Sequence, residues 1–295
     1  MNSATPPKTG APSSYWLSSL GATQEYVDVA GTRTRVLHAG DGPALILLHG
    51  MGGHLENFVT NVLPLSQALN MHVYAIDMMG HGMNSRPESF TFDDMVDHVV
   101  RFMDTMGIKK ASFAGLSLGG LVAPWIALRH PGRVDRLVLV TNFGMYIGES
   151  AEAEAEKRFA YLRDSNKRFM KAPTLEMMRE RMMPMMHDPA AMPEEMIRAR
   201  LHIYQRPGAE RAMVAFVENF YETRQRHILS AERLSQISVP TLVVWGEFNN
   251  PPVAYARQAA AQIPNSSFHV CANSGHWPHF EASEDFNRVV ADFLR

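Results

Sequence analysis

Residues 111–120 read Ala-Ser-Phe-Ala-Gly-Leu-Ser-Leu-Gly-Gly. The apolar run 111–114 predicts a buried strand, and the spacing of apolar residues over 118–129 predicts a helix. A serine between two glycines at such a junction is typical of a nucleophile elbow, a turn so sharp that the residues around the serine must be small. We therefore predict that Ser117 is a nucleophile whose hydroxyl stands above the end of a sheet. The alternative is an ordinary glycine-rich turn.

Short runs of β-branched and apolar residues on both sides of this serine predict further strands. The predicted strands are 25–29, 32–38, 44–48, 72–76, 111–114, 136–140, 241–245 and 267–271. Helical spacing is found at 58–69, 92–106, 118–129 and 286–294. Strands that alternate with helices in this way predict an α/β fold with an eight-stranded, mostly parallel sheet.

The strand pattern stops between residues 144 and 226, where Met, Glu, Arg and Ala dominate at helical spacing. We predict that 144–226 is a helical insertion that covers the site as a lid, and that 15–143 and 227–295 form the core. Residues 1–14 are rich in Pro, Ser, Thr and Gly, which predicts a flexible tail rather than a signal peptide. The apolar runs are far shorter than the roughly 18 residues of a membrane span, so no membrane partner is expected.

The composition argues against several classes of function. The 28 basic and 30 acidic residues give a net charge of −2 and no basic stripe, so nucleic acid is not an expected partner. Cys271 is the single cysteine, which rules out an intramolecular disulfide framework and favours a cytoplasmic protein. We find no metal-ligand spacing and no phosphate-binding loop, so no metal and no cofactor are predicted.

A serine nucleophile needs a neutral imidazole, which we expect after the last predicted strand. His276 lies there, in Asn-Ser-Gly-His-Trp-Pro (273–278), C-terminal to the serine as the order of nucleophile, acid and histidine requires. The loop after strand 241–245 reads Gly-Glu-Phe-Asn-Asn (246–250), with no aspartate. We predict that the amide oxygen of Asn249 orients His276, with Glu247 as the alternative.

An oxyanion hole is predicted from the loop His-Gly-Met-Gly-Gly (49–53), which follows strand 44–48. Such a loop aims a backbone N–H at the site where negative charge forms, opposite the N–H of the residue after the nucleophile. We assign these two donors to the N–H groups of Met51 and Leu118. The alternative is a turn that needs glycine for positive φ.

These motifs resemble those of the α/β-hydrolase superfamily over nearly the whole chain. More narrowly, the chain resembles the meta-cleavage product hydrolases, which hydrolyse C–C bonds in the bacterial degradation of aromatic compounds. The most similar stretch is Gly-His-Trp-Pro-His-Phe-Glu (275–281) with 285–294, and the lid segment 173–200 is similar too. The chain differs from that family at Leu116, usually Asn there, and at Asn249, usually Asp. The resemblance implies hydrolysis of 2-hydroxy-6-oxo-hexa-2,4-dienoates.

The resemblance also implies binding residues. Arg200 matches an arginine that binds the substrate carboxylate, and Asn57 matches a polar residue at the same end of the substrate. A guanidinium suits this role because its fork binds a carboxylate through two hydrogen bonds. We expect Gly50, Phe143 and Trp277 to line the pocket. The implied partners are a small anionic substrate and, because family members are often oligomeric, a second copy of the chain.

Other interpretations stay open from the residues alone. Arg200 has the alternative of a solvated charge on a lid helix. The same Ser117 and His276 would serve a carboxylesterase or a lactonase. Because no aspartate follows strand 241–245, a further alternative is a non-catalytic protein that only binds a ligand on this scaffold.

Overall fold

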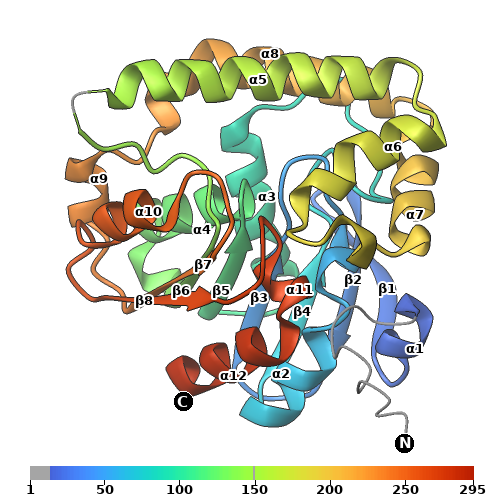
Figure 1. Cartoon of the computed structure of the whole chain (residues 1–295). Helices are drawn as coiled ribbons and strands as arrows, with labels where there is room; N and C mark the ends of the chain where they lie inside the picture. The colour runs from blue at the N-terminus through green and yellow to red at the C-terminus, as the bar shows by residue number, and fades with distance from the viewer. Residues whose placement is uncertain (1–13, 149) are drawn as a thin grey trace, which may run out of the picture.

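Eight strands form one sheet at the centre of the computed structural model, which describes residues 14–148 and 150–295 (Figure 1). The strands are β1 (Thr23–Val29), β2 (Thr32–Ala39), β3 (Ala44–Leu48), β4 (His72–Ile76), β5 (Ala111–Leu116), β6 (Val134–Val140), β7 (Thr241–Gly246) and β8 (Ser266–Cys271). Their order across the sheet is β1-β2-β4-β3-β5-β6-β7-β8. Strand β2 runs antiparallel to β1 and β4, and the other neighbours are parallel. The predicted fold class is confirmed.

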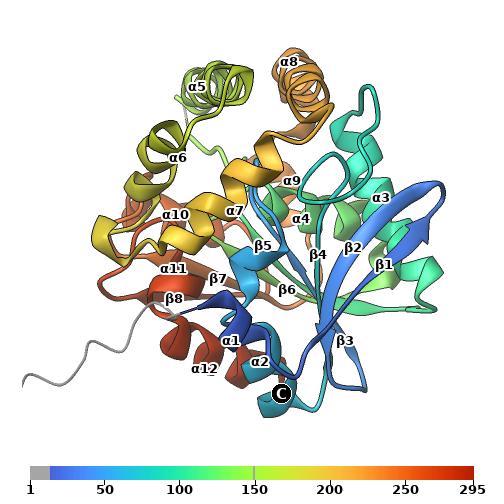
Figure 2. The ribbon, with the colours of Figure 1, turned by 90° about the vertical axis from the view of Figure 1, so that its right-hand side faces the viewer.

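The middle of the sheet is covered on both faces. Every residue of β3, β5 and β7 is buried, which explains why their sequences are continuous apolar runs without alternation. Helices α2 (Val62–Leu69) and α12 (Ser283–Leu294) pack together on one face. Helices α3 (Phe92–Thr105) and α4 (Gly119–Arg129) pack together on the other (Figure 2).

Short helices complete the core. They are α1 (Tyr15–Ser19), α9 (Ala231–Ser235), α10 (Val253–Ala260) and α11 (Pro278–Glu281), with 3₁₀ turns at Leu55–Phe58 and Pro131–Arg133. The prediction of one helix over 58–69 is wrong at its start. Asn57 Oδ1 accepts a hydrogen bond from the N–H of His54 at 3.0 Å, which caps a separate 3₁₀ turn, and α2 begins only at Val62.

The segment predicted as a helical insertion forms α5 (Ala151–Lys171), α6 (Leu175–Met182), α7 (Glu194–Tyr204) and α8 (Ala209–His227), with 3₁₀ turns at Met183–Met185 and Pro189–Ala191. Helices α5 and α8 lie side by side across the top of the molecule in both ribbon views. Phe159 of α5 packs between Phe143 and Phe220 with its ring tilted against both, and the ring centroids are 4.8 Å apart in each pair. These aromatic contacts attach the helical segment to the loop that follows β6.

The N-terminal prediction is only partly within the described residues. Of the predicted tail 1–14, residues 1–13 lie outside them, and Ser14 caps α1 by accepting a hydrogen bond from the N–H of Trp16. In the described part of the chain, no helix is both long enough and apolar enough to cross a bilayer.

Candidate active site

Ser117 lies between β5 and α4 with a φ of +52°, a conformation that is costly for a residue with a side chain. Its N–H donates to the carbonyl of Val140 at 3.0 Å, and its carbonyl accepts from the N–H of Phe143 at 3.0 Å. A Cβ on Gly115 would lie 2.2 Å from the carbonyl oxygen of Gly119, and one on Gly119 would lie 2.2 Å from that of Leu48. The two glycines flanking Ser117 therefore permit the sharp elbow.

His276 lies in the loop between β8 and α11, and three hydrogen bonds position it. Its Nδ1 lies 2.9 Å from Asn249 Oδ1, and its N–H donates to the carbonyl of Met185 at 2.8 Å. Its own carbonyl accepts from Thr141 Oγ1 at 2.8 Å. Burial lowers the pKa of His276 to about 4, and the charge of Arg158 acts in the same direction. The imidazole is therefore neutral near pH 7 and able to accept a proton.

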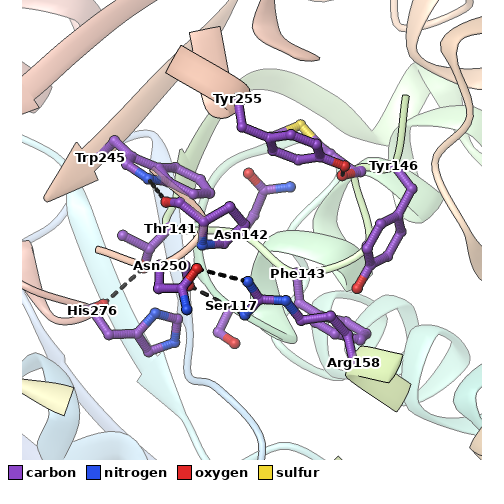
Figure 3. Close-up of a pocket in the computed structure, with 13 residues that line it drawn as sticks. Ser117, Thr141, Asn142, Phe143, Tyr146, Arg158, Trp245, Asn250, Tyr255 and His276 are labelled. Carbon is purple, nitrogen blue, oxygen red and sulfur yellow. Dashed lines mark hydrogen bonds between the residues drawn. The ribbon is translucent and has the colours of Figure 1, made fainter. Parts of the chain in front are cut away.

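Ser117 and His276 line the same two cavities, and Figure 3 shows the imidazole beside the serine hydroxyl. The contact with Asn249 occupies Nδ1 and leaves Nε2 free to act as the base. Hydrogen bonds between nucleophile and base are often loose without substrate and tighten when it binds. The arrangement can therefore support nucleophilic acyl chemistry.

The structure separates the two candidates for the orienting group. Asn249 is buried, and its amide oxygen faces His276. Glu247 is exposed, and its carboxylate accepts a hydrogen bond from the N–H of Asn273 at 3.0 Å. The geometry therefore brings Asn249, and not Glu247, into contact with the imidazole.

The loop predicted to form the oxyanion hole reaches the elbow. The N–H of Gly119 donates to the carbonyl of His49 at 3.1 Å, and the N–H of Gly53 donates to that of Gly50 at 2.9 Å. No described residue accepts a backbone hydrogen bond from Met51 N–H or Leu118 N–H, so both donors are available to a ligand. Gly52 has a φ of +65°, so the loop also needs glycine for its conformation.

Two cavities meet at Ser117. The first is lined by Phe143, Tyr146, Trp245 and Tyr255, with Arg158 and Asn142 as polar neighbours (Figure 3). The second is lined by Gly50, Met51, Asn57, Arg200 and Trp277. The residues predicted to bind substrate are therefore divided between the two sides of the serine, with Phe143 on the first and the others on the second.

Arg200 is 1% exposed, so the alternative of a solvated lid-helix charge is wrong. Its Nε and Nη2 have no hydrogen-bond partner among the described residues. Burial lowers the pKa of Arg200, and the nearby charge of Arg181 adds to this effect. Asn57 is also buried, and its Nδ2 has no partner in the described chain. The second cavity thus holds unused donors.

Sequence reasoning missed Arg181, which lines the second cavity from α6. It stands in the run Arg179-Glu180-Arg181, which is typical of an exposed helix face. Arg179 pairs with Glu194 near the surface, whereas Arg181 is only 8% exposed. No local signal in the sequence separates the two arginines.

His269, Cys271 and Asp285 bring potential metal-ligand atoms within 4.8 Å of one another, away from both cavities. His269 Nε2 already bonds Asp285 Oδ2 at 2.7 Å, and Arg288 pairs with the same carboxylate. These contacts show that the three residues belong to a hydrogen-bonded network within the protein.

Comparison with known proteins agrees with this geometry. The model of the alpha/beta hydrolase fold family matches residues 43–283. The chain belongs to this family. Within the family, the chain is 30% identical to 2-hydroxymuconate semialdehyde hydrolase from Pseudomonas putida, over 90% of this chain and 92% of that one.

Two further relatives place this alpha/beta hydrolase among the same enzymes. A 2-hydroxy-6-oxononadienedioate/2-hydroxy-6-oxononatrienedioate hydrolase from Burkholderia vietnamiensis is 30% identical, over 93% of this chain and 96% of that one. The solved meta-cleavage product hydrolase CumD from Pseudomonas fluorescens IP01 superposes with a TM-score of 0.76 at 28% identity, over 93% of this chain and 98% of that one. The expected relationship to meta-cleavage product hydrolases is confirmed.

Proposed function

We propose that this alpha/beta hydrolase cleaves the C5–C6 bond of 2-hydroxy-6-oxo-hexa-2,4-dienoates. The observation that carries the proposal is the division of the site at Ser117. On one side lies the buried guanidinium of Arg200, two of whose nitrogens have no hydrogen-bond partner among the described residues, and on the other lies a cavity with aromatic walls. A substrate with a carboxylate at one end and an apolar group beyond its ketone matches both sides. The relatives named above act on molecules of this class.

In the proposed complex the carboxylate accepts hydrogen bonds from Arg200 and Asn57, and the C6 substituent occupies the cavity beside Phe143 and Trp245. Gly50 and Trp277 form the wall of the carboxylate side. This pose places the C6 carbonyl over the serine. Helices α5 to α8 would act as the lid that excludes water.

The proposed reaction begins with ketonisation, in which the 2-hydroxyl gives up its proton and C5 takes one up from water with the help of His276. Ser117 Oγ then attacks C6 while its proton passes to His276 Nε2, and Asn249 holds the imidazole in position. The N–H groups of Met51 and Leu118 stabilise the oxyanion. The C5–C6 bond breaks, and its electron pair moves along the conjugated chain to the C2 oxygen, which takes the proton from His276 to form the dienol product. Water then gives a proton to His276 and attacks the acyl-serine, which releases a carboxylic acid and regenerates Ser117.

The decisive experiment follows the visible absorbance of a 6-phenyl and a 6-alkyl 2-hydroxy-6-oxo-dienoate with the wild type and with Ser117→Ala. We expect turnover by the wild type and its loss in the variant. Turnover of p-nitrophenyl esters without turnover of either dienoate would overturn the proposal in favour of an esterase. Thermal stabilisation by the dienoates without any turnover would instead indicate a binding protein.

Arg200→Met provides the control for substrate class. Removing one partner of a buried charge pair costs about 2–5 kcal/mol, so we expect kcat/KM on dienoates to fall by about 30-fold or more. Activity on a neutral ester should change little, because it has no carboxylate for Arg200 to bind. Equal losses on both substrates would contradict the assigned role.

A cytoplasmic location and a homo-oligomer remain part of this proposal. The single cysteine favours the first. The second rests on the family resemblance, and light scattering of the purified chain would measure it directly.

A further inference from the structure

The second cavity is lined by two buried guanidinium groups, and none of the described residues in its wall carries a carboxylate. Its charged or amide-bearing lining residues are Asn57, Arg181 and Arg200. Arg181 Nη2 donates to Asn166 Oδ1 at 2.9 Å, while its Nε and Nη1 have no partner among the described residues. With Arg200 Nε and Nη2 and Asn57 Nδ2, five buried donor atoms lack protein acceptors there.

The contact that holds Arg181 leaves its charge uncompensated. Asn166 of α5 is fully buried, and its amide orients the guanidinium without neutralising it. The rings of Phe169 and Tyr204 lie 5.3 and 5.7 Å from the guanidinium carbon. Aspartate in place of Asn166 would give an ordinary buried ion pair. The cavity therefore retains a second positive charge besides Arg200.

Two buried guanidinium groups that meet no carboxylate among the described lining residues repel each other and lose hydration, which is costly unless a ligand supplies negative charge. One carboxylate neutralises only one of them. The apolar Leu116 and Leu162 on the same wall offer no counter-charge. The cavity is therefore complementary to a ligand end that carries two negative charges close together.

We propose that Arg181 is a specificity-determining residue which, together with Arg200, binds the 2-hydroxy-dienoate end of the substrate as a dianion. The carboxylate binds to Arg200 and Asn57. The C2 oxygen binds to Arg181 as an enolate. This inference rests on the proposed function. The 2-hydroxyl is conjugated to the C6 ketone, so its O–H bond breaks readily. The proton passes to solvent water, and the electron pair stays on the delocalised enolate. The enolate is also the form that accepts a proton at C5.

The test uses Ser117→Ala, which should bind the 6-phenyl dienoate without cleaving it, at a pH where the free substrate is in its enol form. We expect the long-wavelength band of the enolate on binding, and release of about one proton per site to an indicator dye, as one acid group ionises. Adding Arg181→Met should abolish both signals and weaken binding at least tenfold. Arg179→Met, from the same helix, serves as the matched control and should retain both signals.

A ligand without the 2-hydroxyl distinguishes a specific loss of the contact between Arg181 and the C2 oxygen from a general loss of structure in the variant. Binding of a 6-oxo-6-phenyl-dienoate should fall with Arg200→Met and change less than twofold with Arg181→Met. Persistence of the enolate band and proton release in Ser117→Ala/Arg181→Met would overturn the inference, as would their absence in Ser117→Ala. If Arg181→Met alone turns over dienoates like the wild type, the inference fails while the proposed function stands. If the wild type turns over no dienoate, both fail.

Discussion

Asn249 occupies the position where a carboxylate would stabilise the imidazolium formed during catalysis. Its amide oxygen accepts the hydrogen bond of His276 Nδ1 but carries no charge. In a serine protease the change from aspartate to asparagine costs about 10⁴-fold in rate. We therefore expect Asn249→Asp to raise kcat on dienoates at least tenfold, and Asn249→Leu to lower it, in steady-state assays. A lower kcat for Asn249→Asp would show that the neutral amide is required.

The pH profile tests the same residue pair. His276 must be neutral to act as base, and burial lowers its pKa to about 4. In the wild type, kcat/KM should therefore remain level from pH 7 down to about pH 5, measured in short assays after a pH jump. In Asn249→Asp the new carboxylate favours the protonated imidazole, so the acid limb should move to higher pH. An acid limb near pH 6.5 in the wild type would contradict the buried, neutral imidazole.

At the scale of elements, the close packing of α4 against β3 determines where Ser117 stands. Gly119 begins α4, and an added Cβ would lie 2.2 Å from the carbonyl oxygen of Leu48 in β3. Gly119→Ala should therefore destabilise the fold by about 3 kcal/mol, since neither backbone can move away easily. Gly132→Ala is the matched control, because no atom of the described residues lies within 4 Å of its added Cβ. Urea unfolding of both variants measures the difference, and equal midpoints would refute it.

At the scale of the whole molecule, buried neutral histidines make the fold sensitive to acid. Burial lowers the pKa values of His49 and His98 to about 4 and of His279 to about 3. The unfolded chain binds these protons near pH 6.5, so their contribution to stability is complete above that pH and is lost as the pH falls toward 4.

Each of these three histidines changes the free energy of unfolding by at most about 1.4 kcal/mol per pH unit in that window. The urea midpoint should therefore fall clearly between pH 7.5 and pH 5.5, before the carboxylates titrate. His98→Gln should reduce this slope. The same midpoint at both pH values would show that the histidines protonate within the folded protein.

Much of the architecture follows from local sequence. The run 111–120 contains its own strand, elbow and helix start, because glycine placement and apolar periodicity act over a few residues. His276 is identifiable for a similar reason, since chain order places it in the last loop after a strand. Boundaries were less predictable. The 3₁₀ turn at Leu55–Phe58 depends on hydrogen bonds such as that from His54 N–H to Asn57 Oδ1, which periodicity does not reveal.

By itself, the sequence determined the order of strands and helices, the nucleophile elbow and the identity of the histidine, because these depend on patterns among neighbours in the chain. Only the tertiary structure decided between Asn249 and Glu247, and between Arg181 and Arg179. In each pair one residue is buried at the site, whereas Glu247 is exposed and Arg179 is half-buried and paired with Glu194. Burial and charge compensation depend on segments far apart in sequence, such as α5 supplying Asn166 to Arg181. The electrostatic character of the cavity is therefore a property of the assembled fold.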